Sequence, residues 1–437
     1  MLHSTSLSMM EVKLFCTILI LIFVQQSICK QQYNGYTVYG VTLRDQNDIE
    51  FIRNLEAELS LDLWQTGMVG IRDAYLMVKP EYGDHFKQRL DERGMKHYLH
   101  VDNVQRSLDK FERDFTNWKR RRESTAIYNT YARYDEIDAY MERLGSEYPD
   151  LVTVVNAGPS FDGRPVKYVK ISTTNFMDTS KPIYFMDAAM HSREWVTPPV
   201  ALYSMHRLVE DLREEDRDLL ENIDWIIMPV ANPDGYEYSH TDDRMWRRSR
   251  SFNATVSTVC YGADINRNFD FEFGTVSVSS DPCSQIYPGP YPFSEIESRY
   301  LSNIMNEYLD RMEIYQNIHS YGSYILYGFD NETLPANVAQ IHLVGAAMGA
   351  KIDALKMSDA VYYAVGNSNF VLYPASGTAQ DYAQDKGIPF VYTLELPDFG
   401  RYDFLVPPEY IEQINTETWA GLAETARLAR LFYRDRS

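Results

Sequence analysis

The 437-residue sequence is poor in positive charge. Its 42 lysine and arginine residues are outnumbered by 62 aspartate and glutamate residues, so the formal net charge is −20. Proteins that bind nucleic acid need a concentrated basic surface to neutralise phosphates, and the charge balance therefore argues against nucleic acid as a partner. Apolar residues make up 45% of the chain and charged residues 24%, a composition typical of a globular protein with a sizeable core.

Long hydrophobic runs are also lacking. The apolar run at residues 14–24 follows Lys13 and is far shorter than the roughly twenty residues that a membrane helix needs. A basic residue, a short apolar core and small residues before Lys30 are typical of a secretory signal peptide, so we expect residues 1–29 to be removed. A buried N-terminal helix is the alternative. No second run has the length of a membrane span, and we expect a soluble, secreted, extracellular protein with no membrane partner.

Cysteine is scarce, with four residues in the whole chain. Cys16 and Cys29 would leave with the signal peptide, so an even pair remains for an oxidising compartment. We predict a disulfide between Cys260 and Cys283, which would close a loop worth about 3 kcal/mol in chain entropy. Two free buried thiols are the alternative. Sequons at Asn253 and Asn331 are consistent with secretion.

Internal repeats are absent, and the sharpest change in composition is the basic run at residues 119–122. Upstream of it, hydrophobic periodicity predicts strands at 36–43, 74–79 and 98–101 and helices at 46–59 and 81–93. These elements suit a small α+β unit. An amphipathic connecting helix follows at 104–118, with aromatic residues on one face. In a secreted chain, the basic run after this helix is a favoured protease target.

The segment after residue 122 alternates helical patterns with short apolar runs. The helices are expected at 134–147, 198–213, 294–310, 335–351 and 409–433, and the strands at 152–156, 166–172, 183–189, 225–231, 314–319, 324–327 and 389–394. This alternation predicts an α/β fold, a central β-sheet flanked by helices.

Four polar residues lie at or just after the ends of apolar runs: His191, Glu194, His319 and Glu395. A His-x-x-Glu pair alone is a weak signal, but sites in open α/β sheets form at the carboxyl ends of strands. Two imidazoles and one carboxylate suit a catalytic zinc ion that keeps one position open for water. Glu395 is then the candidate general base that accepts the water's proton. A structural carboxylate paired within the sheet is the alternative for Glu395.

Arginines gather in the middle of the same segment, at positions 244, 247, 248, 250 and 267. An arginine fork pairs with a carboxylate, and a guanidinium also stabilises an oxyanion, so these residues suit peptide hydrolysis at a free C-terminus. Surface ion pairing is the alternative for each of them. The other histidines receive no role, and His240 is expected in a polar loop.

Seven motifs, in this order along the chain, resemble the secreted zinc metallocarboxypeptidases of the pancreatic carboxypeptidase A/B type (M14 family). The resemblance spans about residues 36 to 433. Its motifs begin at His191 (HSREW), Asn232 (NPDGY), Met245 (MWR), Asp264 (DINRNF), His319 (HSY), Tyr373 (YPASG) and Thr393 (TLEL).

The resemblance implies a proenzyme with one zinc ion per chain and a mixed central sheet with helices on both faces. Residues 30–122 would be an inhibitory, ferredoxin-like prosegment, cut near Arg122 by an activating protease, and residues 123–437 the catalytic domain. Zinc would be held by His191, Glu194 and His319, with Glu395 and Arg247 catalytic. Other implied roles are substrate binding by Asn266, Arg267, Tyr373, Arg244, Arg193 and Tyr321, orientation of a zinc ligand by Asp264, and a Cys260–Cys283 disulfide.

Two positions implied to shape specificity depart from the digestive members. Gln380 stands where A-type enzymes have Ile and B-type enzymes Asp, and Asp330 stands where Gly or Ser is usual. A buried carboxylate facing a cationic side chain favours basic C-terminal residues. Neutral residues are the alternative, because Asp330 beside the sequon at Asn331 could instead face solvent.

The expected function is therefore a secreted zinc exopeptidase acting on peptides and proteins with a free C-terminus. A catalytically silent relative that binds peptide C-termini is the alternative class, and the presence of all three ligands and the base argues against it. An endopeptidase is disfavoured by the Asn266–Arg267 pair. Nothing demands a partner subunit, and we expect a monomer.

Overall fold

The N-terminal unit has the predicted α+β fold, with four strands where three were expected. In the computed structural model, which describes residues 31–122 and 125–436, its elements are β1 (Thr37–Val41), α2 (Gln46–Leu59), β2 (Asp62–Gln65), β3 (Ala74–Val78), α3 (Gly83–Glu92) and β4 (His97–Val101). The sheet order is β2-β3-β1-β4, with antiparallel neighbours. The helices bury apolar residues spaced by three or four positions, such as Ile49, Ile52 and Phe86. The sequence analysis missed β2, a strand of four residues.

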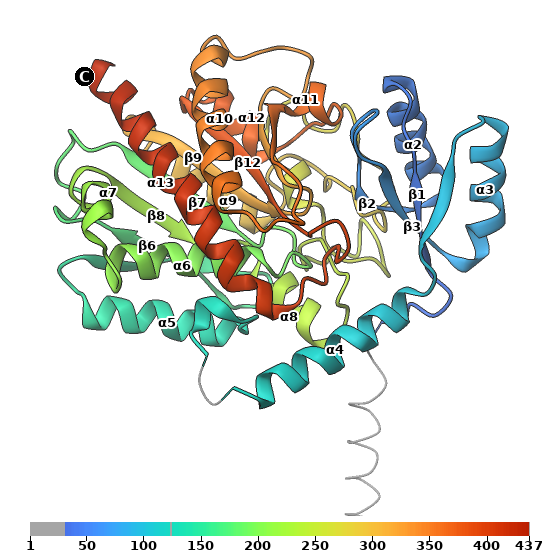
Figure 1. Cartoon of the computed structure of the whole chain (residues 1–437), viewed down its shortest axis with the longest axis horizontal. Coiled ribbons are helices and arrows are strands. Elements are labelled where there is room, and N and C mark those ends of the chain that lie inside the picture. The colour runs from blue at the N-terminus through green and yellow to red at the C-terminus, as the bar shows by residue number, and fades with distance from the viewer. Residues whose placement is uncertain (1–30, 123–124, 437) are drawn as a thin grey trace, which may run out of the picture.

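Helix α4 (Val104–Arg120) connects the two units and lies along the second one (Figure 1). Asn103 caps it, since its side chain accepts a hydrogen bond from the Arg106 backbone N–H. Its buried face carries Leu108 and Phe111, and Phe111 packs against Trp195 and Tyr131 of the second unit. The expected signal peptide, with Cys16 and Cys29, lies outside the described residues.

The second unit is built on an eight-stranded mixed sheet of order β11-β10-β12-β9-β7-β8-β6-β5. Its strands are β5 (Val152–Pro159), β6 (Pro165–Ile171), β7 (Ile183–Ala188), β8 (Asp224–Met228), β9 (Met312–Ser320), β10 (Tyr324–Tyr327), β11 (Ala364–Asn367) and β12 (Phe390–Leu396). Strands β8, β7, β9 and β12 are parallel neighbours. Their carboxyl ends therefore meet at one edge of the sheet.

Helices cover both faces of this sheet (Figure 1). One core involves α5 (Tyr134–Glu147), α6 (Thr197–Val209), α7 (Arg217–Asn222), α10 (Val338–Leu355) and α13 (Ile411–Arg436), and the other α9 (Ile296–Glu307) and α12 (Ala379–Asp385). Along β7, Tyr184 and Met186 enter the first core and Ile183 and Phe185 the second. Strand residues alternate between faces, so a fully apolar run marks a strand that is covered on both sides.

Several short elements differ from the sequence prediction. The structure adds β11, α11 (Ser368–Val371), α12 and α8 (Pro233–Thr241). His240, expected in a polar loop, instead lies on α8, partly buried and with its ring stacked on Trp195 at 3.8 Å. Polar residues dominate α8, so hydrophobic periodicity does not reveal it, although Asn232 and Pro233 begin the helix with a cap and a proline at its first position.

The predicted disulfide is present. Cys260 and Cys283 are bonded, with their Cα atoms 5.2 Å apart. The bond links two parts of a long stretch that has little regular secondary structure between α8 and α9. Among residues 31–122 and 125–436, no helix combines the length and the apolarity that a membrane span requires.

Candidate active site

The four polar residues found at strand ends come together at one edge of the large sheet. His191 and Glu194 lie in the turn between β7 and α6, while His319 and Glu395 lie near the ends of β9 and β12. Strands β9 and β12 are parallel and pair His319 directly with Glu395. The parallel order of the strands therefore brings together residues that are more than 200 positions apart.

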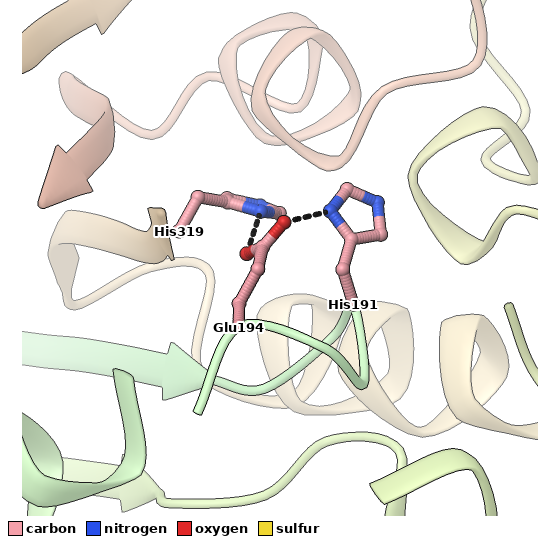
Figure 2. A group of neighbouring side chains, drawn as sticks. All are labelled: His191, Glu194 and His319. Atoms are coloured by element: carbon pink, nitrogen blue, oxygen red, sulfur yellow. Dashed lines mark hydrogen bonds and ion pairs between the residues drawn. The ribbon is translucent and has the colours of Figure 1, made fainter. Parts of the chain in front are cut away.

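His191, Glu194 and His319 form a buried triad. The Glu194 carboxylate lies between the two imidazole rings (Figure 2), with Oε1 2.8 Å from His191 Nδ1 and Oε2 3.0 Å from His319 Nδ1. The potential ligand atoms all lie within 4.8 Å of one another. Burial opposes ionisation of Glu194, but the charges and hydrogen bonds of the two histidines hold its pKa well below the usual range. Two imidazole nitrogens and a carboxylate oxygen are the donor set of a catalytic zinc site, so these residues fit a zinc ion.

Behind His191 lies a second carboxylate. Asp264 Oδ1 is 3.0 Å from His191 Nε2, and its Oδ2 accepts a hydrogen bond of 2.7 Å from Arg247 Nη2. Burial works against the charge on Asp264, yet Arg247 and His191 keep its pKa well below the usual range. The ionised carboxylate favours a proton on Nε2 of His191 and leaves Nδ1 free to bind a metal.

Glu395 is a partly buried carboxyl group that lines the same cavity. Its Oε2 has no hydrogen-bond partner among the described residues. Burial, together with the charge of Glu194, raises the pKa of Glu395 to about 8, although His319 and Arg247 act in the opposite direction. An unpaired carboxyl group facing a cavity can exchange a proton with a ligand, whereas one paired within the sheet could not.

The guanidinium groups predicted to hold substrate line this cavity. Arg267 Nη2 donates to the Tyr373 hydroxyl at 3.1 Å, and Asn266 Oδ1 accepts from the Ala379 backbone N–H at 2.9 Å. The cavity lining includes Arg193, Arg247, Asn266, Arg267, Tyr321 and Tyr373 together with the triad and Glu395.

Arg244 lies away from this lining. Its guanidinium lies 3.8 Å from the Trp195 ring and 5.6 Å from the ring of Phe111 on α4, and donates to the backbone oxygens of Arg193 and Phe404. In this arrangement Arg244 supports the walls of the site and packs against the connecting helix.

Asp330 and Gln380 lie together outside the lining of this cavity. Asp330 is 4% exposed, so it does not face solvent despite the neighbouring sequon. Its carboxylate accepts hydrogen bonds from Ser368 and Thr378, and the side-chain amide of Gln380 lies 2.9 Å from the Ser368 hydroxyl. Burial and the nearby charge of Asp381 raise the pKa of Asp330 well above its usual range. A positive charge brought to this group would favour its ionised form.

The N-terminal unit covers the mouth of the site. Asp62 Oδ2 accepts a hydrogen bond of 2.5 Å from Arg193 Nη1, and the Arg53 guanidinium lies 4.2 Å from the centre of the Tyr373 ring. Trp64 packs against Phe404. The sequence analysis assigned no individual residue of this unit to the site, because Asp62 and Trp64 lie on the four-residue strand β2 that it missed.

Comparisons with known proteins agree with this geometry. The family described as "Zinc carboxypeptidase" matches residues 137–421, and "Carboxypeptidase activation peptide" matches residues 39–111. The chain is similar to carboxypeptidase B of Helicoverpa zea (40% identity, covering 92% of this chain and 96% of that protein) and to carboxypeptidase A1 of Bos taurus (31%, 90% and 93%). Among solved structures it is similar to carboxypeptidase A from Helicoverpa armigera, with a TM-score of 0.88 at 41% identity, covering 92% of this chain and 99% of that one.

Proposed function

The chain belongs to the zinc carboxypeptidase family and carries that family's activation peptide, and from this premise we propose which of its residues perform the reaction. As a metallocarboxypeptidase it hydrolyses the C-terminal peptide bond of its substrates. We assign zinc binding to His191, Glu194 and His319. The observation that supports this assignment most strongly is the convergence of these three donor groups beside the unpaired carboxyl group of Glu395.

Each remaining group of the cavity has a defined task in this proposal. Zinc, when bound, supplies a Lewis acid that lowers the pKa of water and polarises a carbonyl. Glu395 accepts a proton from the attacking water and passes it to the leaving amine. Arg247 donates hydrogen bonds to the carbonyl oxygen as negative charge develops on it.

The residues around Arg267 explain the choice of the last peptide bond. Arg267 and Asn266 hold the substrate's terminal carboxylate, and Tyr373 covers it. A guanidinium buried in a cavity gains a partner when a free C-terminus enters, and an amidated peptide leaves that charge unpaired. Arg193, Arg244 and Tyr321 contact or support the residues upstream of the scissile bond.

The main test uses the chain after proteolysis near Arg122. Processed protein should contain one zinc per chain and release single residues from peptides with a free C-terminus. A chelator should abolish this activity and added zinc restore it. Zinc-free protein that retained full activity would contradict the proposal, and so would equal cleavage of amidated peptides.

We also propose the domain boundaries and the route of activation. Residues 1–29 act as a signal peptide that directs secretion, residues 30–122 form the inhibitory prosegment, and residues 123–437 form the catalytic domain. The contact between Asp62 and Arg193 supports inhibition by coverage of the site. N-terminal sequencing of the secreted and the protease-treated protein checks both cleavage points.

For specificity we propose a preference for C-terminal Lys or Arg. The support is the burial of Asp330. Among the described residues, its carboxylate, next to Gln380, accepts hydrogen bonds from the hydroxyls of Ser368 and Thr378 and forms no ion pair with a lysine or arginine. A basic substrate side chain would supply that charge. Peptides ending in Arg, Phe and Gln separate this preference from a neutral one.

The matched variants are Asp330→Asn and, as a control, Asp385→Asn at an exposed position of α12. Asp330→Asn should lower kcat/KM for the Arg-ending peptide by about tenfold or more relative to the Phe-ending one, since a buried charge pair is lost. No cleavage of the Arg-ending peptide by the unaltered enzyme would refute the assignment of Asp330.

A further inference from the structure

The two zinc-ligand histidines differ in what lies behind them. His191 Nε2 faces the Asp264 carboxylate, whereas His319 Nε2 faces the side-chain oxygen of Asn317. Asn317 lies two residues before His319 on β9, and residues two apart point to the same side of a strand. Both side chains are fully buried. An amide carries a donor and an acceptor, so its orientation decides what it offers to the imidazole.

A second residue settles that orientation. Asn317 Nδ2 donates to Asp187 Oδ2 at 2.8 Å, and the two residues are paired neighbours on the parallel strands β9 and β7. Burial raises the pKa of Asp187 to about 6, so the group is ionised at neutral pH. An ionised carboxylate can only accept hydrogen bonds. The NH₂ group of Asn317 is thereby held towards Asp187, and its carbonyl oxygen is held towards His319.

The carbonyl oxygen in turn selects one tautomer of His319. An oxygen acceptor requires a proton on Nε2, and a neutral imidazole with a proton on Nε2 has its lone pair on Nδ1. Nδ1 is the atom that faces Glu194 Oε2 at 3.0 Å. Asp187 thus acts on the ligand atom of His319 through an amide, in the way that Asp264 acts directly on His191.

We propose that Asn317 and Asp187 are positioning residues that set the tautomer and ring orientation of His319 for zinc binding. The inference rests on the proposed zinc ligands but not on catalysis. It assigns a function to a buried carboxylate that takes no part in the reaction. Groups that hydrogen-bond to metal-binding histidines commonly change metal affinity by about 10- to 100-fold when they are replaced.

The first experiment reads the hydrogen bond at Nε2 of His319 in the zinc-loaded chain. Nitrogen and proton NMR of the full chain with labelled histidine should show an Nε2–H proton that is hydrogen-bonded and exchanges slowly with solvent, the signal being assigned by its loss in a His319→Gln variant. Asp187→Asn keeps the shape but lets the Asn317 amide turn round and present its NH₂ group to Nε2, so this proton should lose its hydrogen bond and exchange faster. A wild-type Nε2–H without a hydrogen bond, or an exchange rate unchanged in Asp187→Asn, would overturn the proposal.

The second experiment measures zinc affinity by competition with a chelator. Asp187→Asn should bind zinc about tenfold more weakly. The exchange variant Asp187→Asn/Asn317→Asp should recover most of that loss, because Asn at 187 would donate to Asp at 317, which still offers an oxygen to His319. A double variant as weak as the single one would refute the directed chain of hydrogen bonds.

Gln316→Met is the matched control, since Gln316 is also buried on β9 and interacts with Tyr184 and Tyr392 rather than with a ligand histidine. Its zinc affinity should equal that of the unaltered chain. A loss as large as in Asp187→Asn would show a general packing effect and overturn the inference. The hydrogen bond at Nε2 of wild-type His319 remains decisive if a variant does not fold. Failure of the unaltered chain to bind zinc would refute the proposed function separately.

Discussion

The zinc-ligand centre and the interface that covers it use charge in different ways. At the centre, the charged groups are buried and their partners all come from the catalytic unit, as in the contacts of Glu194 and Asp264. At the interface, each pair joins the two units: Asp62 binds Arg193, and His100 lies 3.2 Å from Asp403. Arg72 likewise donates to the Tyr362 backbone oxygen.

This difference indicates that the geometry of the zinc ligands and the coverage of the site depend on separate sets of contacts. Among the described residues, the hydrogen bonds of the triad all lie within the second unit, so removing the N-terminal unit should leave the ligand geometry intact. The interface contacts, by contrast, all disappear on its removal and free Arg193 and Tyr373. Changes at the centre should therefore alter turnover without altering prosegment affinity, and changes at the interface should do the reverse.

The largest effect is expected for Glu395→Gln. Loss of the proton acceptor should lower kcat by about 10²–10⁴-fold, the range for general acid–base groups, while the zinc content stays at one per chain. Steady-state kinetics and metal analysis of the processed enzyme measure both. Added prosegment should bind the variant as it binds the parent. Equal activity in the variant would remove Glu395 from its assigned role.

Arg267→Ala should selectively weaken binding of free C-termini. Loss of the buried guanidinium should reduce kcat/KM for a free-acid peptide by about 100-fold, since truncating one partner of a buried charge pair costs about 3 kcal/mol or more. The same peptide as an amide should be cleaved with nearly unchanged, low efficiency. Discrimination equal to that of the parent enzyme would contradict the carboxylate-binding role.

Asp62→Asn should loosen the prosegment while leaving the mature enzyme unchanged. Its carboxylate pairs with Arg193, and both side chains are almost fully buried, so the lost pair should raise the dissociation constant of the cleaved prosegment by about 100-fold. Inhibition of processed enzyme by the isolated variant prosegment measures this. Asp84→Asn is the control, because Asp84 is fully exposed and pairs only with Lys87 of its own helix. An unaltered dissociation constant for Asp62→Asn would show that the pair does not hold the units together.

The smallest expected effect is a pH dependence at His100. This ring is stacked on Tyr75 at 4.1 Å and faces Asp403, with Asp398, Tyr98 and Tyr321 also nearby. Burial opposes its charge, but the hydrogen bond to Asp403 and the charges of both aspartates raise the pKa of His100 above its ordinary value.

Because the pKa is higher in the joined state than in the free prosegment, the contact is strongest below the ordinary histidine pKa of about 6.5 and is lost as pH rises through the raised value. Prosegment affinity should therefore fall between about pH 6 and pH 9 through this group. His100→Gln should flatten that profile, whereas His97→Gln, on the same strand but bonded within its own unit, should not. A profile unaffected by His100→Gln would rule out this contribution.

Hydrophobic pattern was sufficient for the long elements and for the fully apolar short strand β10, which was predicted at 324–327, but insufficient for the other short elements. The strands around residues 183–189 and 314–319 and the helix at 134–147 were predicted within a few residues, because each buries a continuous or periodic apolar face. Strands β2 and β11, with four residues each, carry too few side chains to show a period. Helix α8 has a mostly polar sequence, which resembles that of a loop. Its cap and its packing on the rest of the chain stabilise it, and neither produces a hydrophobic period.

The residues of the candidate site also differ in how far the sequence could predict them. The ligand and base residues were predicted because each follows an apolar run that must be a buried strand, and because they lie in motifs of a known family. For Asp330 the resemblance implied a buried wall position, but residue type and the adjacent sequon left exposure open, and only the structure decided between them. The depth of Asp330 depends on Ser368 and Thr378, which are about 40 to 50 residues away in the chain.

By itself, the sequence determined the candidate residues for the chemistry and the long elements of the fold, because residue type and local periodicity are properties of neighbouring positions. Only the tertiary structure decided which atoms face one another: Asn317 between His319 and Asp187, and Asp62 against Arg193. Those contacts depend on strand order, register and the docking of two units. Such contacts form when distant segments of the chain bury surface against one another, so no pattern among neighbouring residues can predict them.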